Sequence, residues 1–141
     1  MAPSAKTILL VEDQPDLRDF LSNLLTAGGY HTIYAADKDE GLQQSREERP
    51  DLIIIDMMMP TEQGIRLYRS LKTDTDLNSI PVFMLSSINK RMFFQCHQIQ
   101  KECATKGLPV PQAYIETPPE AEELLSLIRT LIQPGAPESR T

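Results

Sequence analysis

Short apolar runs that do not alternate with polar residues constrain the fold of this chain most strongly. They are TILLV at 7–11, HTIYA at 31–35, LIII at 52–55, VFML at 82–85 and, more weakly, AYI at 113–115. Uninterrupted apolar strands are expected where both faces of a sheet are covered, as in parallel sheets. The runs therefore predict five strands of a buried parallel sheet.

Helical patterns lie between these runs. The first has Pro15 in its first turn, which suits that residue, and carries leucines and Phe20 at i, i+3, i+4, i+7 and i+8 over 17–25. It stops at Gly28-Gly29. Further helices are indicated by residues 38–48, by Ile65, Tyr68 and Leu71, by Met92, Cys96, Ile99 and Cys103, and by Ala121, Leu124, Leu125, Ile128, Leu131 and Ile132. Five strands alternating with five helices predict an α/β fold, a doubly wound (βα)5 flavodoxin-like sandwich with a five-stranded parallel sheet of order 2-1-3-4-5.

The chain of 141 residues is most simply one domain, which we place at 1–133. The tail PGAPESRT at 134–141 is expected to be a frayed terminus or the start of a linker. Since little sequence follows the last helix, we expect a single-domain module or a fragment of a longer protein. The breakers Gly107, Pro109 and Pro111 fall in a long interval, 87–112, that predicts an extended helix or an added loop before the fifth strand.

Charge and hydropathy exclude several classes of partner. The net charge of −6 and the pI of about 4.9 argue against nucleic acid and anionic membrane surfaces, which require a basic face. No apolar run approaches the roughly 20 residues of a membrane span. The amino-terminal MAPSAKTILLVED lacks a signal-peptide core, and Cys96 and Cys103 are too few for a disulfide framework. We therefore expect a cytoplasmic protein.

Three acidic residues follow two of the predicted strands. Glu12 and Asp13 come after the first strand, and Asp56 comes after the third. In the order 2-1-3-4-5 these strands are neighbours, about 4.8 Å apart, so their carboxyl ends bring the three side chains together. Like charges at that distance repel one another, and a divalent cation relieves the repulsion. An all-oxygen set suits Mg²⁺.

The alternative for each acid is a structural one. An aspartate after a strand often caps the next helix, and for Asp13 alone this interpretation has equal weight. For Asp56 the sequence Met57-Met58-Met59-Pro60 delays the next helix, which makes capping less favoured. We expect these methionines to pack in the loop.

Four segments in order resemble the receiver domain of bacterial response regulators. They are ILLVEDQPDLRDFL, PDLIIIDMMMPTEQG, IPVFMLSS and AYIETPP, and the resemblance covers residues 5 to 133. The acidic pair after the first strand and the D-x-x-x-P-x-x-x-G block at 56–64 are its most specific parts. The resemblance implies a phosphoacceptor signalling module of a two-component phosphorelay rather than an enzyme.

The resemblance assigns roles to the acidic residues. Asp56 matches the phosphoacceptor, which takes a phosphoryl group from a phosphohistidine on a sensor histidine kinase or phosphotransfer protein. Glu12 and Asp13 match the acidic pair that holds Mg²⁺, with Asp56 and the backbone carbonyl of Met58 as further ligands. A carboxylate is a nucleophile toward phosphorus, and Mg²⁺ neutralises the transferring oxygens.

The resemblance also implies a switch and an output face. Ser86 matches the hydroxyl residue that follows the phosphoryl group, and Tyr114 matches the aromatic residue that rotates with it. Downstream protein partners would dock on the face made by helix 4, strand 5 and helix 5. We expect a monomer or a weak dimer.

One departure from the family changes the charge of the site. The family has a lysine just before a proline after the fifth strand, and here Thr117 stands in its place. A threonine hydroxyl donates a hydrogen bond but supplies no positive charge. Lys90, four residues past Ser86, is the candidate for a compensating cation. The alternative function is an atypical receiver that acts as a phosphorylation-independent docking module.

Overall fold

The computed structural model describes residues 6–86, 100–101, 103–117 and 119–133. The strands are β1 (Thr7–Val11), β2 (His31–Ala35), β3 (Leu52–Asp56), β4 (Val82–Ser86) and β5 (Ala113–Glu116). The helices are α1 (Pro15–Ala27), α2 (Lys38–Glu48), the 3-10 turn η1 (Pro60–Glu62), α3 (Gln63–Thr73) and α5 (Ala121–Leu131). Within the described residues, none of these helices combines the length and hydropathy needed to cross a bilayer.

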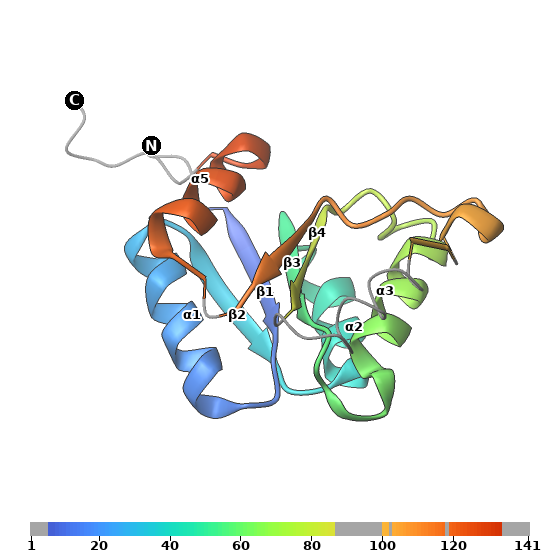
Figure 1. Cartoon of the computed structure of the whole chain (residues 1–141), viewed down its shortest axis with the longest axis horizontal. Coiled ribbons are helices and arrows are strands. Elements are labelled where there is room, and N and C mark those ends of the chain that lie inside the picture. Colours follow the sequence, from blue (N-terminus) through green and yellow to red (C-terminus); the bar gives the residue numbers. More distant parts are fainter. Residues whose placement is uncertain (1–5, 87–99, 102, 118, 134–141) are drawn as a thin grey trace.

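All five strands run parallel in the order β2-β1-β3-β4-β5, so the predicted sheet is confirmed. Helices α1 and α5 cover one face, and α2 and α3 cover the other (Figure 1). Along β1 the side chains alternate between these layers: Ile8 and Leu10 pack with α1 and α5, whereas Leu9 and Val11 pack on the other side. Helices cover both faces and exclude solvent from them, which is why the sequence of β1 is apolar without alternation.

The start of α1 decides the structural alternative for Asp13. Pro15 is the first helical residue, as expected, and Gln14 occupies the N-cap without a side-chain cap. Asp13 therefore does not cap this helix, and the capping interpretation is wrong. Gly29, with φ of 97°, follows the helix and supplies the left-handed backbone that reverses the chain.

Helix α3 begins unusually close to the end of β3. A Cβ atom placed on Gly64 would collide with the backbone carbonyl oxygen of Asp56. Only glycine lets the helix start at this distance, so the glycine of the D-x-x-x-P-x-x-x-G block has a direct steric purpose. The turn before it holds Thr61 and Glu62 in left-handed backbone with φ near 57°.

The interval predicted at 87–112 falls largely outside the described residues, and Lys90, Met92, Cys96 and Ile99 lie there. Residues 103–106 are helical, and Gly107, with φ of 70°, follows them. The hydroxyl of Tyr68 on α3 donates to the Pro109 carbonyl, and the Gln112 amide donates to the Val82 carbonyl at 2.9 Å. The described end of this interval is thus fastened to α3 and to β4.

Candidate functional site

Backbone hydrogen bonds hold the acidic residues at the carboxyl ends of β1 and β3, which form one edge of the sheet. Asp56 is the last residue of β3 and pairs with Leu85 of β4. The Glu12 amide donates to the Ala35 carbonyl at 3.0 Å, which extends the pairing of β1 with β2 by one residue. The backbone of both acidic residues is therefore held by the sheet, and the adjoining loops begin only after them.

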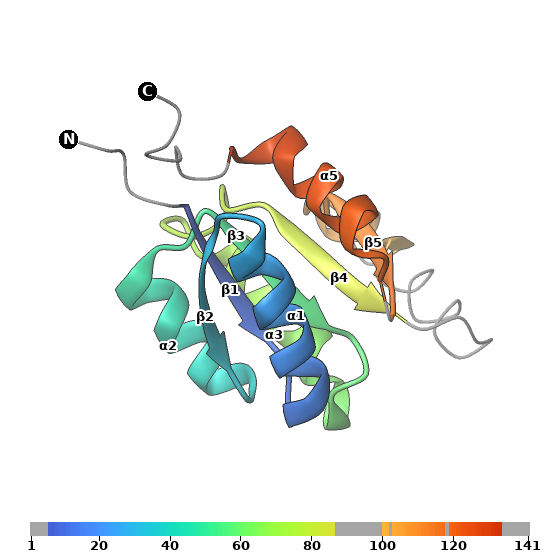
Figure 2. The same cartoon turned by 90° about the vertical axis from the view of Figure 1, so that its left-hand side faces the viewer.

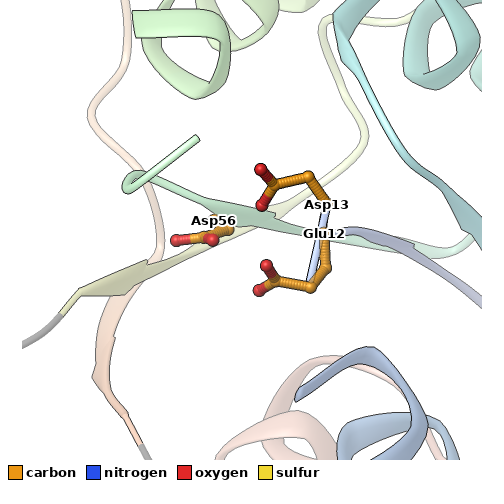
Figure 3. A group of neighbouring side chains, drawn as sticks. All are labelled: Glu12, Asp13 and Asp56. Carbon is orange, nitrogen blue, oxygen red and sulfur yellow. The ribbon is translucent and has the colours of Figure 1, made fainter. Parts of the chain in front are cut away.

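Three carboxylates meet at this edge. Glu12, Asp13 and Asp56 each offer an oxygen atom, and these atoms all lie within 4.8 Å of one another (Figure 3). Glu12 is 0% exposed and Asp56 is 4% exposed, while Asp13 is more open to solvent. The convergence predicted from the strand order is confirmed.

Each buried carboxylate accepts one backbone hydrogen bond from its own loop. The Met58 amide donates to Asp56 Oδ1 at 2.7 Å, and the Gln14 amide donates to Glu12 Oε2 at 3.2 Å. The other oxygen of Glu12, Oε1, is buried and has no hydrogen-bond partner in the described part of the chain. Buried polar atoms are seldom left in this state, so this oxygen requires a proton, a water molecule or a bound ion.

The electrostatics of the cluster lead to the same requirement. Burial, reinforced by the neighbouring Asp56 carboxylate, raises the pKa of Glu12 from 4.5 to about 9. Burial likewise raises the pKa of Asp56, against the opposing effects of Glu12 and of the Met58 amide. Among the described residues, no lysine or arginine forms an ion pair with either group. The protein without metal therefore holds a proton in this cluster at neutral pH.

The donor set fits a hard divalent cation. All three side chains offer carboxylate oxygens, which Mg²⁺ prefers over nitrogen or sulfur ligands. The unpartnered Glu12 Oε1 would gain a partner on metal binding. A cation would also replace the proton and cancel the repulsion that burial intensifies.

The remaining residues singled out from the sequence lie around this edge. Ser86 ends β4, one residue beyond the partner of Asp56. Tyr114 in β5 is half-buried and packs against the core on the α2 and α3 side. Thr117 directly follows β5 and is half-buried. The proposed compensating cation, Lys90, is outside the described residues.

The methionines after Asp56 divide into two roles. Met57 and Met59 are buried in the core, as expected for loop packing, but Met58 is 45% exposed. Sequence reasoning did not separate these three residues. It also did not recognise the contact of Gly64 with the Asp56 backbone, although a glycine at the start of a helix, where propensity disfavours it, was the available signal.

Comparison with known families agrees with this arrangement. The sequence model described as response regulator receiver domain matches residues 8–103, which is more than half of the chain. The chain belongs to this family, and it is a receiver domain of two-component signalling.

Individual relatives show the extent of the similarity. The phosphate regulon transcriptional regulatory protein PhoB of Escherichia coli (strain K12) is 30% identical over 134 residues, which cover 94% of this chain and 54% of the relative. The chain thus spans about half the length of this relative. The receiver domain of a signal transduction histidine kinase from Syntrophus aciditrophicus has 32% identity and a TM-score of 0.75, covering 90% of this chain and 89% of that one. A response regulator from Chloroflexus aurantiacus has a TM-score of 0.77 at 23% identity, which shows the shared fold alone.

Proposed function

We propose that Asp56 accepts a phosphoryl group from the phosphohistidine of a sensor histidine kinase or phosphotransfer protein, and that this event changes how the domain binds a downstream protein. The observation that carries the proposal is the position of Asp56. Its carboxylate ends a buried central strand, with two more carboxylates within 4.8 Å. A carboxylate on such a rigid element is a preorganised nucleophile.

Glu12, Asp13 and Asp56 would hold Mg²⁺, with the backbone carbonyl of Met58 as a further ligand. When bound, the metal supplies positive charge to the oxygens of the transferring phosphoryl group. The chain itself orients the nucleophile, because the Met58 amide fixes Asp56 Oδ1 at 2.7 Å. Burial of Asp56 excludes water from the nucleophile.

Ser86 and Tyr114 are the proposed switch residues. Ser86 is the last residue of β4, and Tyr114 lies within the neighbouring strand β5. Thr117 offers a hydroxyl where the family has a lysine, so the cation must come from elsewhere or be missing. Lys90 remains the candidate in the sequence. The proposed output face includes β5 and α5.

The proposal is tested by intact mass spectrometry after incubation with Mg²⁺ and acetyl phosphate. We expect one phosphoryl adduct that disappears in Asp56→Asn and when EDTA replaces Mg²⁺. Asp16→Asn is the matched control, because Asp16 is an exposed acid at the start of α1, near the site, and this variant should keep the adduct.

The absence of an adduct in the wild type, with donor and metal in excess, would contradict the proposal. The second candidate function would then apply, in which the domain docks its partner without phosphorylation. It rests on the sequence, which has Thr117 where the family has a lysine.

A further inference from the structure

A cavity of about 280 Å³ lies between β5 and α5. The apolar part of its floor is made by Ile115 of β5 and Leu124 of α5, which are buried, and by Leu127, which is 37% exposed. Both elements lie together at the outer edge of the sheet, where no further strand covers them in the described part of the chain (Figure 2). Leu131, one helical turn beyond Leu127, is also exposed, so the apolar strip continues along α5.

Three exposed carboxylates surround this floor. Glu116 lies on β5, and Glu120 and Glu123 lie at the start of α5. None of the three forms an ion pair with a described residue, whereas the nearby Glu122 pairs with Arg129 at 3.4 Å. Within the part of the chain that the structure describes, the rim is therefore negative and uncompensated.

Helix stability accounts for only part of this rim. An acid in the first turn favours the helix dipole, and this explains Glu123. Glu120 occupies the N-cap but makes no side-chain cap hydrogen bond. Glu116 belongs to β5 and lies outside the helix altogether. Two of the three acids thus have no stabilising partner in the described structure.

We propose that this cavity is the docking site for a protein segment that presents lysine or arginine beside an aliphatic or aromatic side chain, as a basic amphipathic helix does. The apolar side chain fills the floor, and the cation meets the three carboxylates. The inference rests on the proposed function and names the chemistry of the output partner.

Charge favours a basic protein segment over a second copy of this chain and over nucleic acid. The chain carries a net charge of −6, so a second copy would bring more negative charge to an already negative rim. Nucleic acid is excluded for the same reason. A basic partner gains attraction from the same residues, mostly in its rate of association.

The test is a selection from a phage-displayed library of random dodecapeptides against the full chain. The counter-selection uses Glu116→Gln/Glu120→Gln/Glu123→Gln, which keeps the shape of the rim and removes its charge. We expect the peptides kept by the wild type and lost by this variant to be enriched in lysine or arginine next to leucine, isoleucine or an aromatic residue. Selected peptides without basic residues, or none that separate the two proteins, would overturn the inference.

A synthetic peptide from the selection then gives affinities by fluorescence anisotropy. The triple variant should weaken binding at least tenfold, and Leu127→Ala should weaken it without changing its salt dependence. The matched control is Asp39→Asn/Glu47→Gln/Glu48→Gln on α2, which changes net charge equally but on the opposite layer, and its affinity should stay within twofold of the wild type. Circular dichroism confirms that each variant is folded, and equal losses in both triple variants would refute a specific site.

The two proposals fail separately. Charge-dependent peptide binding in Asp56→Asn, together with no phosphoryl adduct in the wild type, would remove the phosphoacceptor proposal and leave the docking site. A phosphoryl adduct with no charge-dependent binding, measured both before and after phosphorylation, would do the reverse.

Discussion

Glu12 combines full burial with an oxygen atom that lacks a hydrogen-bond donor in the described structure. Between pH 4.5 and about 9 the native protein binds more protons at this residue than the unfolded chain does. The free energy of unfolding of the protein without metal should therefore fall as pH rises through this window, and the effect should vanish below it. This pH dependence is the opposite of that of an ordinary salt-bridged carboxylate.

Glu12→Gln replaces the carboxylate with a neutral group of nearly the same shape. In EDTA at pH 8 we expect the variant to be more stable than the wild type by about 0.5–2 kcal/mol, because the amide is neutral in both states, whereas Glu12 must take up a proton when the chain folds at this pH. Urea unfolding at pH 5 and pH 8 measures this, and the advantage should shrink at pH 5. An equal or lower stability at pH 8 would show that burying Glu12 does not carry this cost of proton uptake.

Gly64→Ala tests the close approach of α3 to β3. The added Cβ collides with the Asp56 carbonyl, and we expect a loss of about 1–3 kcal/mol together with weaker Mg²⁺ binding. Gly107→Ala is the control: nothing lies within 4 Å of its Cβ, so its cost comes only from the φ of 70°, about 1–2 kcal/mol. Urea unfolding and Mg²⁺ titration of both variants decide this, and unchanged metal binding in Gly64→Ala would contradict it.

At the scale of elements, two tyrosines tie distant segments together, one in each layer. Tyr30, just before β2, donates to the Ile132 carbonyl at 3.0 Å after α5. Tyr68 on α3 donates to the Pro109 carbonyl. Each ring is buried in the core of its own layer. The hydroxyl groups connect pieces of chain that the sheet does not join.

Tyr68→Phe should cost about 0.5–1.5 kcal/mol and loosen the segment before β5. Hydrogen exchange measured by mass spectrometry should accelerate at 107–112 and stay unchanged at the end of α5. Tyr30→Phe, its counterpart in the other layer, should give the converse pattern. A uniform acceleration in both variants would mean that the hydroxyls contribute only to global stability.

For the whole molecule, a metal ion at the acidic edge should be coupled to folding. A ligand that binds only the native state at 100 times its Kd stabilises it by about 2.7 kcal/mol. We expect millimolar Mg²⁺ to raise Tm relative to EDTA in the wild type and to have little effect in Asp13→Asn. Scanning calorimetry at constant ionic strength measures this. The same rise in both proteins would show that the effect is general screening rather than binding at this site.

The identity of the strands, their parallel order and the meeting of the three acids were all predictable from the sequence. They follow from local rules: uninterrupted apolar runs require two covered faces, and parallel strands end at one edge. Glu12 and Asp56 are therefore brought together by the chain order itself. The glycine at position 64 was visible in the sequence too, but its reason was not, because the atom that it approaches is a backbone carbonyl eight residues away.

The tertiary structure alone decided which groups are left without partners. Asp13 proved not to cap α1, where Gln14 holds the N-cap. Met57 and Met59 pack in the core while Met58 between them is exposed, and this division depends on how the segment after β3 lies against the rest of the fold. The apolar cavity and its acidic rim also depend on how β5 lies against α5. Burial and desolvation are properties of the whole fold, whereas periodicity and strand order are properties of the chain, and for that reason the sequence determined the sheet and its acidic edge while only the structure determined their charge state and neighbours.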